Sequence, residues 1–360
     1  MLGSAVRPGG TAGSVYALLA SRKFASVSVP ARRAAPASGM LSQVSAPSAF
    51  ATGAGRPCPG PDRRARLGAV TPPAALPPAL PGDPRLTPAR PDLADERLRD
   101  LVEAARYVPG TPQRVTAMLA PLRRAPRADA ALDTEALCGD PVTVYEVADG
   151  WAFVQLGLDG YVGYLPAAAL GPPDPAPTHR VTALRSFVFP VPDLKRPPLG
   201  HLSLGARVSV VAIEDGYALL AGGGAVWAAH LSAPDARAAD IAGTAERLVG
   251  TPYLWGGRSS LGLDCSGLVQ LVLGEAGLAA PRDADMQERG LGTHLPLDPA
   301  GLRRGDLVFW RGHVGLMLDG ERLIHANGHH MAVAVEPLSA ATARIAAAGS
   351  GPVTALKRLA

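Results

Sequence analysis

Apolar and polar residues alternate in short runs between residues 111 and 234, and Asp-Gly or Gly-rich turns separate these runs. Alternation with a period of two is typical of strands with one buried face, so the pattern predicts small antiparallel barrels. The pattern occurs twice, because residues 114–118 (RVTAM) recur as residues 180–184 (RVTAL), 66 positions later. The same offset relates the DGW turn at 149–151 to the DGY turn at 215–217, and we extend it to Leu165 and Leu231. We therefore predict a duplicated domain, with a first copy at residues 111–172 and a second copy at residues 177–234.

The pattern changes after residue 236. An apolar run follows Cys265 without a proline, which predicts a buried helix of about three turns that ends near Gly277. Asp264 or Ser266 is a suitable N-cap. Farther on, three apolar runs predict strands, and the Asp-Gly pair at 319–320 predicts a hairpin between the last two; the runs are residues 307–310, 314–318 and 322–326. Residues 236–360 therefore form an α+β domain in this interpretation.

One thiol and two histidines in this last domain are candidates for chemistry. Cys265 would lie at the positive end of its helix, where we expect the pKa of a thiol to fall. His313 and His325 lie on neighbouring strands of the predicted hairpin, so one ring can orient the other. A nucleophile, a base and an orienting polar group are the parts of a cysteine hydrolase. Each residue also has a plainer interpretation, as a buried structural thiol or a core histidine.

The motifs around these residues resemble the NlpC/P60 cysteine peptidases, which have a papain-like fold. Five segments match in chain order, namely PYLWGG (252–257), DCSG (264–267), GDLVF (305–309), HVG (313–315) and IHA (324–326). The two preceding domains resemble bacterial SH3 domains. This combination is similar to the γ-D-glutamyl-L-diamino acid endopeptidases, which cleave the γ-D-glutamyl bond to a diamino acid in murein (peptidoglycan) stem peptides. The resemblance covers roughly residues 85–360.

The resemblance implies roles for individual residues. The nucleophile falls on Cys265, the base on His313 and the third polar residue on His325. The substrate-binding positions of the catalytic domain fall on Tyr253, Trp255, Asp264 and Ser266. Asp264 and Ser266 match residues that hold the free amino group of the substrate, although Asp264 is equally suited to be a simple helix cap. The backbone N–H of Cys265 and the Tyr253 hydroxyl are candidate donors to the oxyanion.

In relatives, the first SH3 domain closes one side of the substrate groove and limits the enzyme to short peptides with a free amino end. If this holds here, a carboxylate and a tyrosine of the first copy face Cys265. Our candidates are Glu135 and Tyr161, with Asp140 as the second choice for the acid. Tyr161 also fits a plain role as an aromatic that packs in the sheet.

The first 84 residues differ from the rest, because they are rich in Ala, Pro, Gly, Ser and Arg and predict a disordered tail. Residues 1–82 hold nine of the 35 Lys and Arg residues but only one of the 31 Asp and Glu residues, so the remainder is slightly acidic and carries no nucleic-acid footprint. The apolar stretch at residues 15–20 is too short to span a membrane. Between tail and first copy, helical spacing at residues 92–106 predicts a helical lead-in over residues 85–110.

Three cysteines, at 58, 138 and 265, form no disulfide framework, which favours a reducing compartment. We therefore expect a cytoplasmic enzyme that recycles wall peptides, with a secreted or periplasmic protein as the less favoured alternative. We also expect a monomer that needs no cofactor. A zinc site built from Cys265 and the histidines at 313, 325, 329 and 330 is disfavoured, because the spacing matches no ligand motif. Two competing hypotheses stay open, namely a wall-binding scaffold with an inactive catalytic domain and an amidase or acyltransferase of the same fold.

Overall fold

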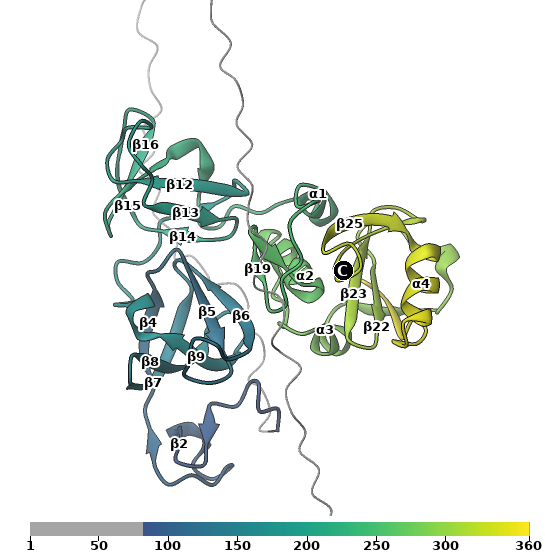
Figure 1. Cartoon of the computed structure of the whole chain (residues 1–360), viewed down its shortest axis with the longest axis horizontal. Helices are drawn as coiled ribbons and strands as arrows, with labels where there is room; N and C mark the ends of the chain where they lie inside the picture. Colours follow the sequence, from purple (N-terminus) through teal and green to yellow (C-terminus); the bar gives the residue numbers. More distant parts are fainter. Residues whose placement is uncertain (1–81, 360) are drawn as a thin grey trace, which may run out of the picture. The chain divides into compact units, whose positions relative to one another are not determined.

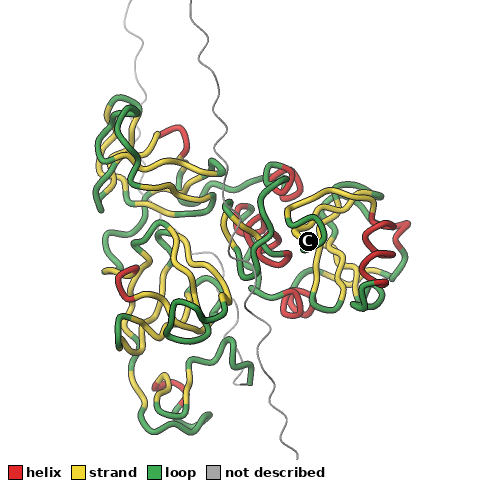
Figure 2. Tube along the Cα trace, viewed as in Figure 1, coloured by secondary structure: helices red, strands yellow, loops and turns green. Residues whose placement is uncertain are grey.

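A computed structural model describes residues 82–359 of the chain. The predicted tail therefore lies outside the described residues, apart from its last three positions. Strands dominate the described residues, and the α-helices lie in the C-terminal part (Figure 1, Figure 2). No helix among residues 82–359 combines the length and the apolar character that a bilayer crossing requires.

The lead-in segment is built of short strands, so the predicted helix over residues 92–106 is wrong. Its elements are β1 (Ala89–Arg90), β2 (Leu93–Asp95), the 3-10 turn η1 (Glu96–Leu98) and β3 (Tyr107–Val108). Three consecutive residues, Leu93 to Asp95, are buried, which a helix with one apolar stripe does not achieve. Tertiary pairing of β2 with β1 and β3 replaces the helical hydrogen bonds.

The first copy forms one seven-stranded sheet with the order β10-β4-β7-β8-β9-β5-β6. Alternate residues of these strands bury a common apolar core that includes Val115, Leu122, Val154 and Leu165. The strands are β4 (Thr111–Val115), β5 (Leu119–Arg123), β6 (Leu132–Leu137), β7 (Pro141–Ala148), β8 (Trp151–Leu156), β9 (Val162–Pro166) and β10 (Leu170–Gly171), with the 3-10 turn η2 (Ala167–Ala169) before β10.

The second copy repeats this chain path in two smaller sheets, of order β14-β11-β18 and β13-β12-β17-β16-β15. The turns match closely, since Asp149 and Asp215 both have a positive φ, as do Gly150 and Gly216. The strands are β11 (His179–Val181), β12 (Arg185–Phe189), β13 (Gly200–Ser203), β14 (Arg207–Val208), β15 (Val210–Glu214), β16 (Tyr217–Leu220), β17 (Ala225–Trp227) and β18 (Leu231–Ser232), with η3 (Ala228–His230) before β18.

The offset of 66 ends inside one hairpin, which corrects our extension of it to Leu165 and Leu231. Trp151 pairs with Pro166 in the first copy, and Tyr217 pairs with Trp227 in the second. Because these pairs are equivalent, the hairpin that joins β8 to β9 is five residues longer than its counterpart. Leu231 is therefore the counterpart of Leu170, and each of the two pairs with the valine at the start of its copy.

The C-terminal part consists of a six-stranded antiparallel sheet of order β21-β26-β22-β23-β24-β25, with α2 (Cys265–Glu275) on one face and α4 (Leu338–Ala347) on the other (Figure 1). Leu316 and Ile324 pack with α2, whereas Met317 and Leu323 pack with α4. The strands are β21 (Thr293–Leu295), β22 (Leu307–Trp310), β23 (His313–Met317), β24 (Arg322–Asn327), β25 (Ala332–Pro337) and β26 (Ala355–Arg358); α1 (Ile241–Glu246), the pair β19 (Arg258–Ser259) and β20 (Gly262–Leu263), α3 (Ala284–Gly290) and the 3-10 turn η4 (Pro299–Gly301) complete it.

Each copy contributes one buried ion pair to this C-terminal part. Asp140 of the first copy pairs with Arg258 on β19. Arg180 of the second copy pairs with Glu275 at the end of α2. All four side chains are less than 10% exposed, so removal of one partner would leave an uncompensated charge inside the protein.

Candidate active site

Cys265 is the first residue of α2, as its sequence context predicts. The side chain of Asp264 caps the helix by accepting the Gly267 N–H at 2.7 Å, and Gly277, with φ +78°, follows the end of the helix. Two backbone N–H groups, of Val314 and Ser266, contact the sulfur and lower its pKa. Because Val314 directly follows His313, the thiol lies at the His313 end of β23.

The expected fall in the thiol pKa is wrong for the resting protein. Burial, followed by the charge of Asp264, raises the pKa of Cys265 to about 12, and the N–H groups of Val314 and Ser266 and the charge of Arg282 offset only part of that rise. Among the described residues no hydrogen bond joins the sulfur to either imidazole. The thiol therefore rests in its protonated form and must lose its proton during the reaction itself.

The two histidines meet on adjacent strands, as predicted. His313 Nε2 lies 2.8 Å from His325 Nδ1, and His325 Nε2 lies 2.7 Å from a carboxylate oxygen of Glu336 on β25. Glu336 in turn pairs with Arg344 on α4. Burial lowers the pKa of His313 to about 3, with smaller contributions from His325 and Arg344, so the ring is neutral near pH 7.

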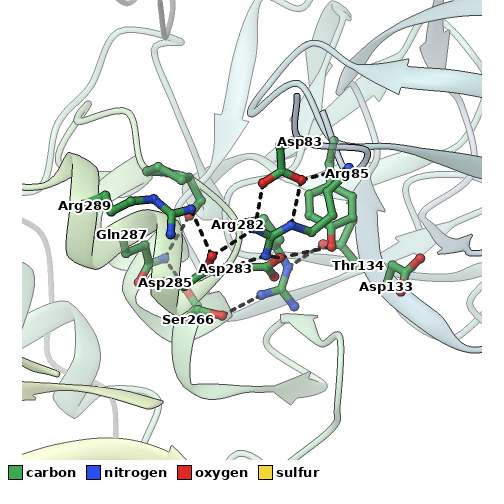
Figure 3. A network of polar contacts seen from close by, with 12 residues as sticks. Asp83, Arg85, Asp133, Thr134, Ser266, Arg282, Asp283, Asp285, Gln287 and Arg289 are labelled. Carbon is green, nitrogen blue, oxygen red and sulfur yellow. Dashed lines mark hydrogen bonds and ion pairs between the residues drawn. The ribbon is translucent and has the colours of Figure 1, made fainter. Parts of the chain in front are cut away.

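Asp264 and Ser266 lie in a network centred on Arg282, which is 1% exposed (Figure 3). The Arg282 guanidinium donates to both oxygens of Asp264 at 2.9 and 2.6 Å and to Ser266 Oγ at 2.9 Å. Asp264 also accepts from the Gly256 N–H at 2.9 Å, in addition to the Gly267 cap. Its acceptor sites are therefore already filled within the protein, which supports the structural role of this carboxylate.

Tyr253 and Trp255 lie on the loop that precedes the nucleophile in the chain. Tyr253 packs against the core that contains Cys265, and burial, the Cys265 thiol and Asp264 raise the pKa of its hydroxyl to about 12. Trp255 is 71% exposed and free to contact a ligand. A cavity of about 210 Å³ lies beside His313 and is lined by Tyr253, Asn327 and two arginines, Arg311 and Arg344; Cys265 does not line it.

The first copy reaches this region with the residues that we singled out. Glu135 Oε2 accepts the Arg258 N–H at 2.9 Å, while the Arg258 guanidinium pairs with Asp140. Arg282 donates to the hydroxyl of Thr134, the neighbour of Glu135 on β6, at 2.7 Å. Among residues 82–359 no salt bridge reaches the Glu135 carboxylate, although it is only 5% exposed. Burial raises its pKa and outweighs the opposing effects of its hydrogen bonds to Arg258 and Ser259 and of the Arg258 and Arg282 charges.

Tyr161 packs in the first copy, as one of the two interpretations expects, and its hydroxyl contacts Asp283 of the C-terminal part. Its ring belongs to the buried core of the first copy, and its hydroxyl donates to Asp283, just before α3, at 3.1 Å. Asp283 also accepts from Arg85 of the lead-in, which binds Asp285 as well (Figure 3). The longer hairpin makes a second contact, because Asp159 accepts from Gln270 of α2 at 2.8 Å.

One group of side chains has the composition of a metal site. His325, His330 and Glu336 place possible ligand atoms within 4.8 Å of one another. However, His325 and Arg344 already occupy the Glu336 carboxylate, and the Arg344 charge opposes a cation there. His329 and His330 are exposed on their turn, as predicted.

Several residues of the site carry little signal in the sequence. Arg258, Arg282 and Glu336 are ordinary charged residues in their local context. Arg258 and Arg282 have partners far away in the chain, whereas the partners of Glu336 lie on the neighbouring strand and on α4. The dipeptide at 281–282 (PR) gives no sign that its arginine is buried. Glu336 had one weak signal, since it lies in an alternating run that pairs with the His325 strand.

Comparison with known proteins agrees with this division. Residues 250–346 match the NlpC/P60 family, and residues 122–170 match the bacterial dipeptidyl-peptidase Sh3 domain. A gamma-D-glutamyl-L-lysine dipeptidyl-peptidase of Bacillus cereus is 27% identical over 241 residues, which covers 58% of this chain and 71% of that protein. A protein of the same name from Bacillus subtilis is 29% identical over 222 residues, covering 55% and 73%.

Among solved structures, the crystal structure of an NlpC/P60 family protein from Bacillus cereus has a TM-score of 0.57 and 21% sequence identity. The similarity covers 69% of this chain and 99% of that one. It confirms the NlpC/P60 fold.

Proposed function

We propose that this chain, a cysteine peptidase of the NlpC/P60 family that carries a bacterial SH3 domain, hydrolyses the bond between γ-D-glutamate and a diamino acid in murein peptides. The names of the two Bacillus relatives support this bond, and so does the sequence of motifs around Cys265. The observation that carries the proposal is the ordered set of a thiol at a helix start and two hydrogen-bonded imidazoles on the adjoining strands. As part of the proposal, the second copy is also an SH3-like barrel and the catalytic domain is papain-like.

The proposed reaction starts from a neutral thiol and a neutral imidazole. Cys265 passes its proton to His313 as the sulfur attacks the γ-glutamyl carbonyl. His313 then gives this proton to the amine nitrogen of the diamino acid, the C–N bond breaks, and a thioester and the free amine result. Water, deprotonated by His313, then releases the glutamyl product and the thiol. In this mechanism the backbone N–H of Cys265 and the Tyr253 hydroxyl stabilise the oxyanion. Because burial raises the thiol pKa and lowers the imidazole pKa, proton transfer and attack are coupled rather than sequential.

We further propose that Glu135 binds the free amino end of the substrate. Its carboxylate is buried and forms no salt bridge among residues 82–359, because the nearby Arg258 and Arg282 pair with Asp140 and Asp264 and their charges do not offset the burial of Glu135. An ammonium group would supply the missing counter-charge. In this arrangement Asp264 and Ser266 act chiefly by holding Arg282, and Trp255 and Tyr161 border the subsite. An enzyme that requires a free amino group on its substrate acts on released peptides. This requirement fits cytoplasmic recycling better than cleavage of intact wall.

The deciding experiment is cleavage of L-Ala-γ-D-Glu-meso-diaminopimelate with a free or an N-acetylated alanine, followed by mass spectrometry. We expect release of L-Ala-D-Glu from the free peptide alone. Equal cleavage of both peptides would remove the amine-binding role, and cleavage of neither would contradict the proposed function. Cys265→Ala, which removes only the thiol, should abolish turnover while the protein stays folded.

A further inference from the structure

Four side chains form a continuous hydrogen-bonded file across the sheet, from His313 through His325 and Glu336 to Arg344. The nitrogen-to-nitrogen and nitrogen-to-oxygen contacts are 2.8 Å and 2.7 Å, and Arg344 completes the file from α4. The strand register explains the contact, because His325 pairs with Ala334 and Glu336 follows two residues later on the same face.

Charge decides which atoms carry protons along this file. Burial raises the pKa of Glu336, but His325 and Arg344 outweigh burial and leave the pKa below its usual value. The carboxylate is therefore ionised near neutral pH and only accepts hydrogen bonds. Consequently Nε2 of His325 must carry a proton and donate it.

The two imidazoles are constrained in the same way. Burial lowers the pKa of His325, so the ring is neutral and carries one proton only. With that proton on Nε2, its Nδ1 is an acceptor, and Nε2 of His313 must be the donor across the 2.8 Å contact. Since His313 is neutral as well, its Nδ1 keeps a free lone pair.

We propose that Glu336, held by Arg344, is a positioning residue that fixes the tautomers of both imidazoles and so keeps His313 Nδ1 available as the base. The inference rests on the proposed function only in that a base is needed for the hydrolysis; the tautomers themselves exist without substrate. When His313 takes the Cys265 proton, the new positive charge is balanced through His325 by the Glu336 carboxylate, and no second proton moves.

The test measures the tautomers directly in the full chain labelled with ¹⁵N-histidine, by long-range ¹H–¹⁵N correlation near pH 7. We expect both His313 and His325 to be protonated on Nε2. In Glu336→Ala we expect both rings to become tautomeric mixtures and kcat to fall about 10- to 100-fold, in the range for a lost charge-assisted hydrogen bond, with KM changed less than about twofold. Glu336→Gln, whose amide oxygen can accept the same hydrogen bond, should keep the tautomers and lose less activity.

Asp306→Asn is the matched control. Asp306 is a buried carboxylate of the same domain that pairs with Arg358 and lies outside the file. We expect this substitution to lower stability but to leave both tautomers unchanged. Protonation of His313 on Nδ1 in the wild type, or unchanged tautomers in Glu336→Ala, would overturn the proposal. If the wild type cleaves no peptide but shows the expected tautomers and their loss in Glu336→Ala, the proposed function fails while this inference stands.

Discussion

The two copies share a chain path but differ in the side chains with which they contact the catalytic domain. The first copy presents Glu135, Asp140 and Tyr161 to the catalytic domain. The second copy has His201 and Ala206 at the positions of Glu135 and Asp140, and its shorter hairpin has no counterpart of Tyr161. The duplicated domain has thus kept its strand order along the chain in both copies, whereas Glu135, Asp140 and Tyr161 occur in the first copy only.

The second copy instead exposes large apolar side chains. Leu194, Val211 and Ile213 are between 62% and 71% exposed, and Trp227 is 43% exposed. Its contacts with the catalytic domain include the Arg180–Glu275 ion pair, at the far end of α2 from Cys265, and the hydrogen bonds between Ser203 and Ser260. The two copies therefore contact different parts of the catalytic domain, the first the segments around Arg258 and Asp283 and the second the end of α2.

The largest expected effect is on the free energy of unfolding. It tests the feature that the two copies share, a buried ion pair with the C-terminal domain. Asp140→Ala and Arg180→Ala each leave a buried partner charge unpaired, so each should lower the free energy of unfolding by about 3–5 kcal/mol. Urea denaturation measures this. Asp129→Ala removes an exposed pair with Arg127 and should change the free energy by less than about 1 kcal/mol. Similar small losses in all three variants would mean that the buried pairs do not join the domains.

The next effect is on kcat/KM, and it distinguishes the role of the first copy from that of the second. Glu135→Gln should lower kcat/KM for the free-amine peptide about 10- to 100-fold, as expected for loss of about 1.5–3 kcal/mol from a charged hydrogen bond. His201→Gln, at the same position of the second copy, should leave kcat/KM unchanged. Steady-state kinetics on both variants measure the difference. Equal losses would show that the first copy has no special role in binding.

Local signals explain which parts of this fold could be predicted. The helix after Cys265 has its cap and its stop within the chain segment itself, and the Asp-Gly turn at 319–320 brings His313 and His325 onto adjacent strands. The helix prediction for residues 92–106 failed because the helical spacing of Leu93, Leu98 and Leu101 competes with strand pairing of β2 to β1 and β3, which flank that stretch within the lead-in. Leu101 is in fact 59% exposed, so the apolar stripe was accidental.

The polar part of the site could be predicted only in outline. Cys265, His313 and His325 stand in motifs, whereas Arg258 and Arg282 gain their roles from residues of another domain. The sign of the thiol pKa shift was wrong for the same reason. A helix start can be read locally, but the burial that outweighs it is a property of the packed structure.

A smaller effect concerns pH. Because burial raises the pKa of Glu135, this carboxylate loses its charge at a higher pH than an ordinary glutamate does. KM for the free-amine peptide should therefore rise as the pH falls toward and through that raised pKa.

The raised pKa of Glu135 also means that the folded state holds this proton more tightly than the unfolded state. The wild type should therefore gain stability relative to Glu135→Gln as the pH falls below neutral, and lose it as the pH rises through the folded pKa. Parallel stability curves for the two proteins would contradict the burial of this charge.

The smallest effect tests the extra length of the first hairpin. Tyr161→Phe removes only the hydroxyl that donates to Asp283, so the free energy of unfolding should fall by about 1 kcal/mol and kcat/KM by less than about fivefold. Trp227→Phe, at the end of the shorter hairpin in the second copy, should leave kcat/KM unchanged, because the ring packs on Tyr217 within its own copy. In the Tyr161→Phe variant Asp283 still forms its salt bridge with Arg85, and the loss of stability is therefore small. A combined Tyr161→Phe and Arg85→Ala variant should lose more than the sum of the two single changes, since Asp283 would then be left without either partner.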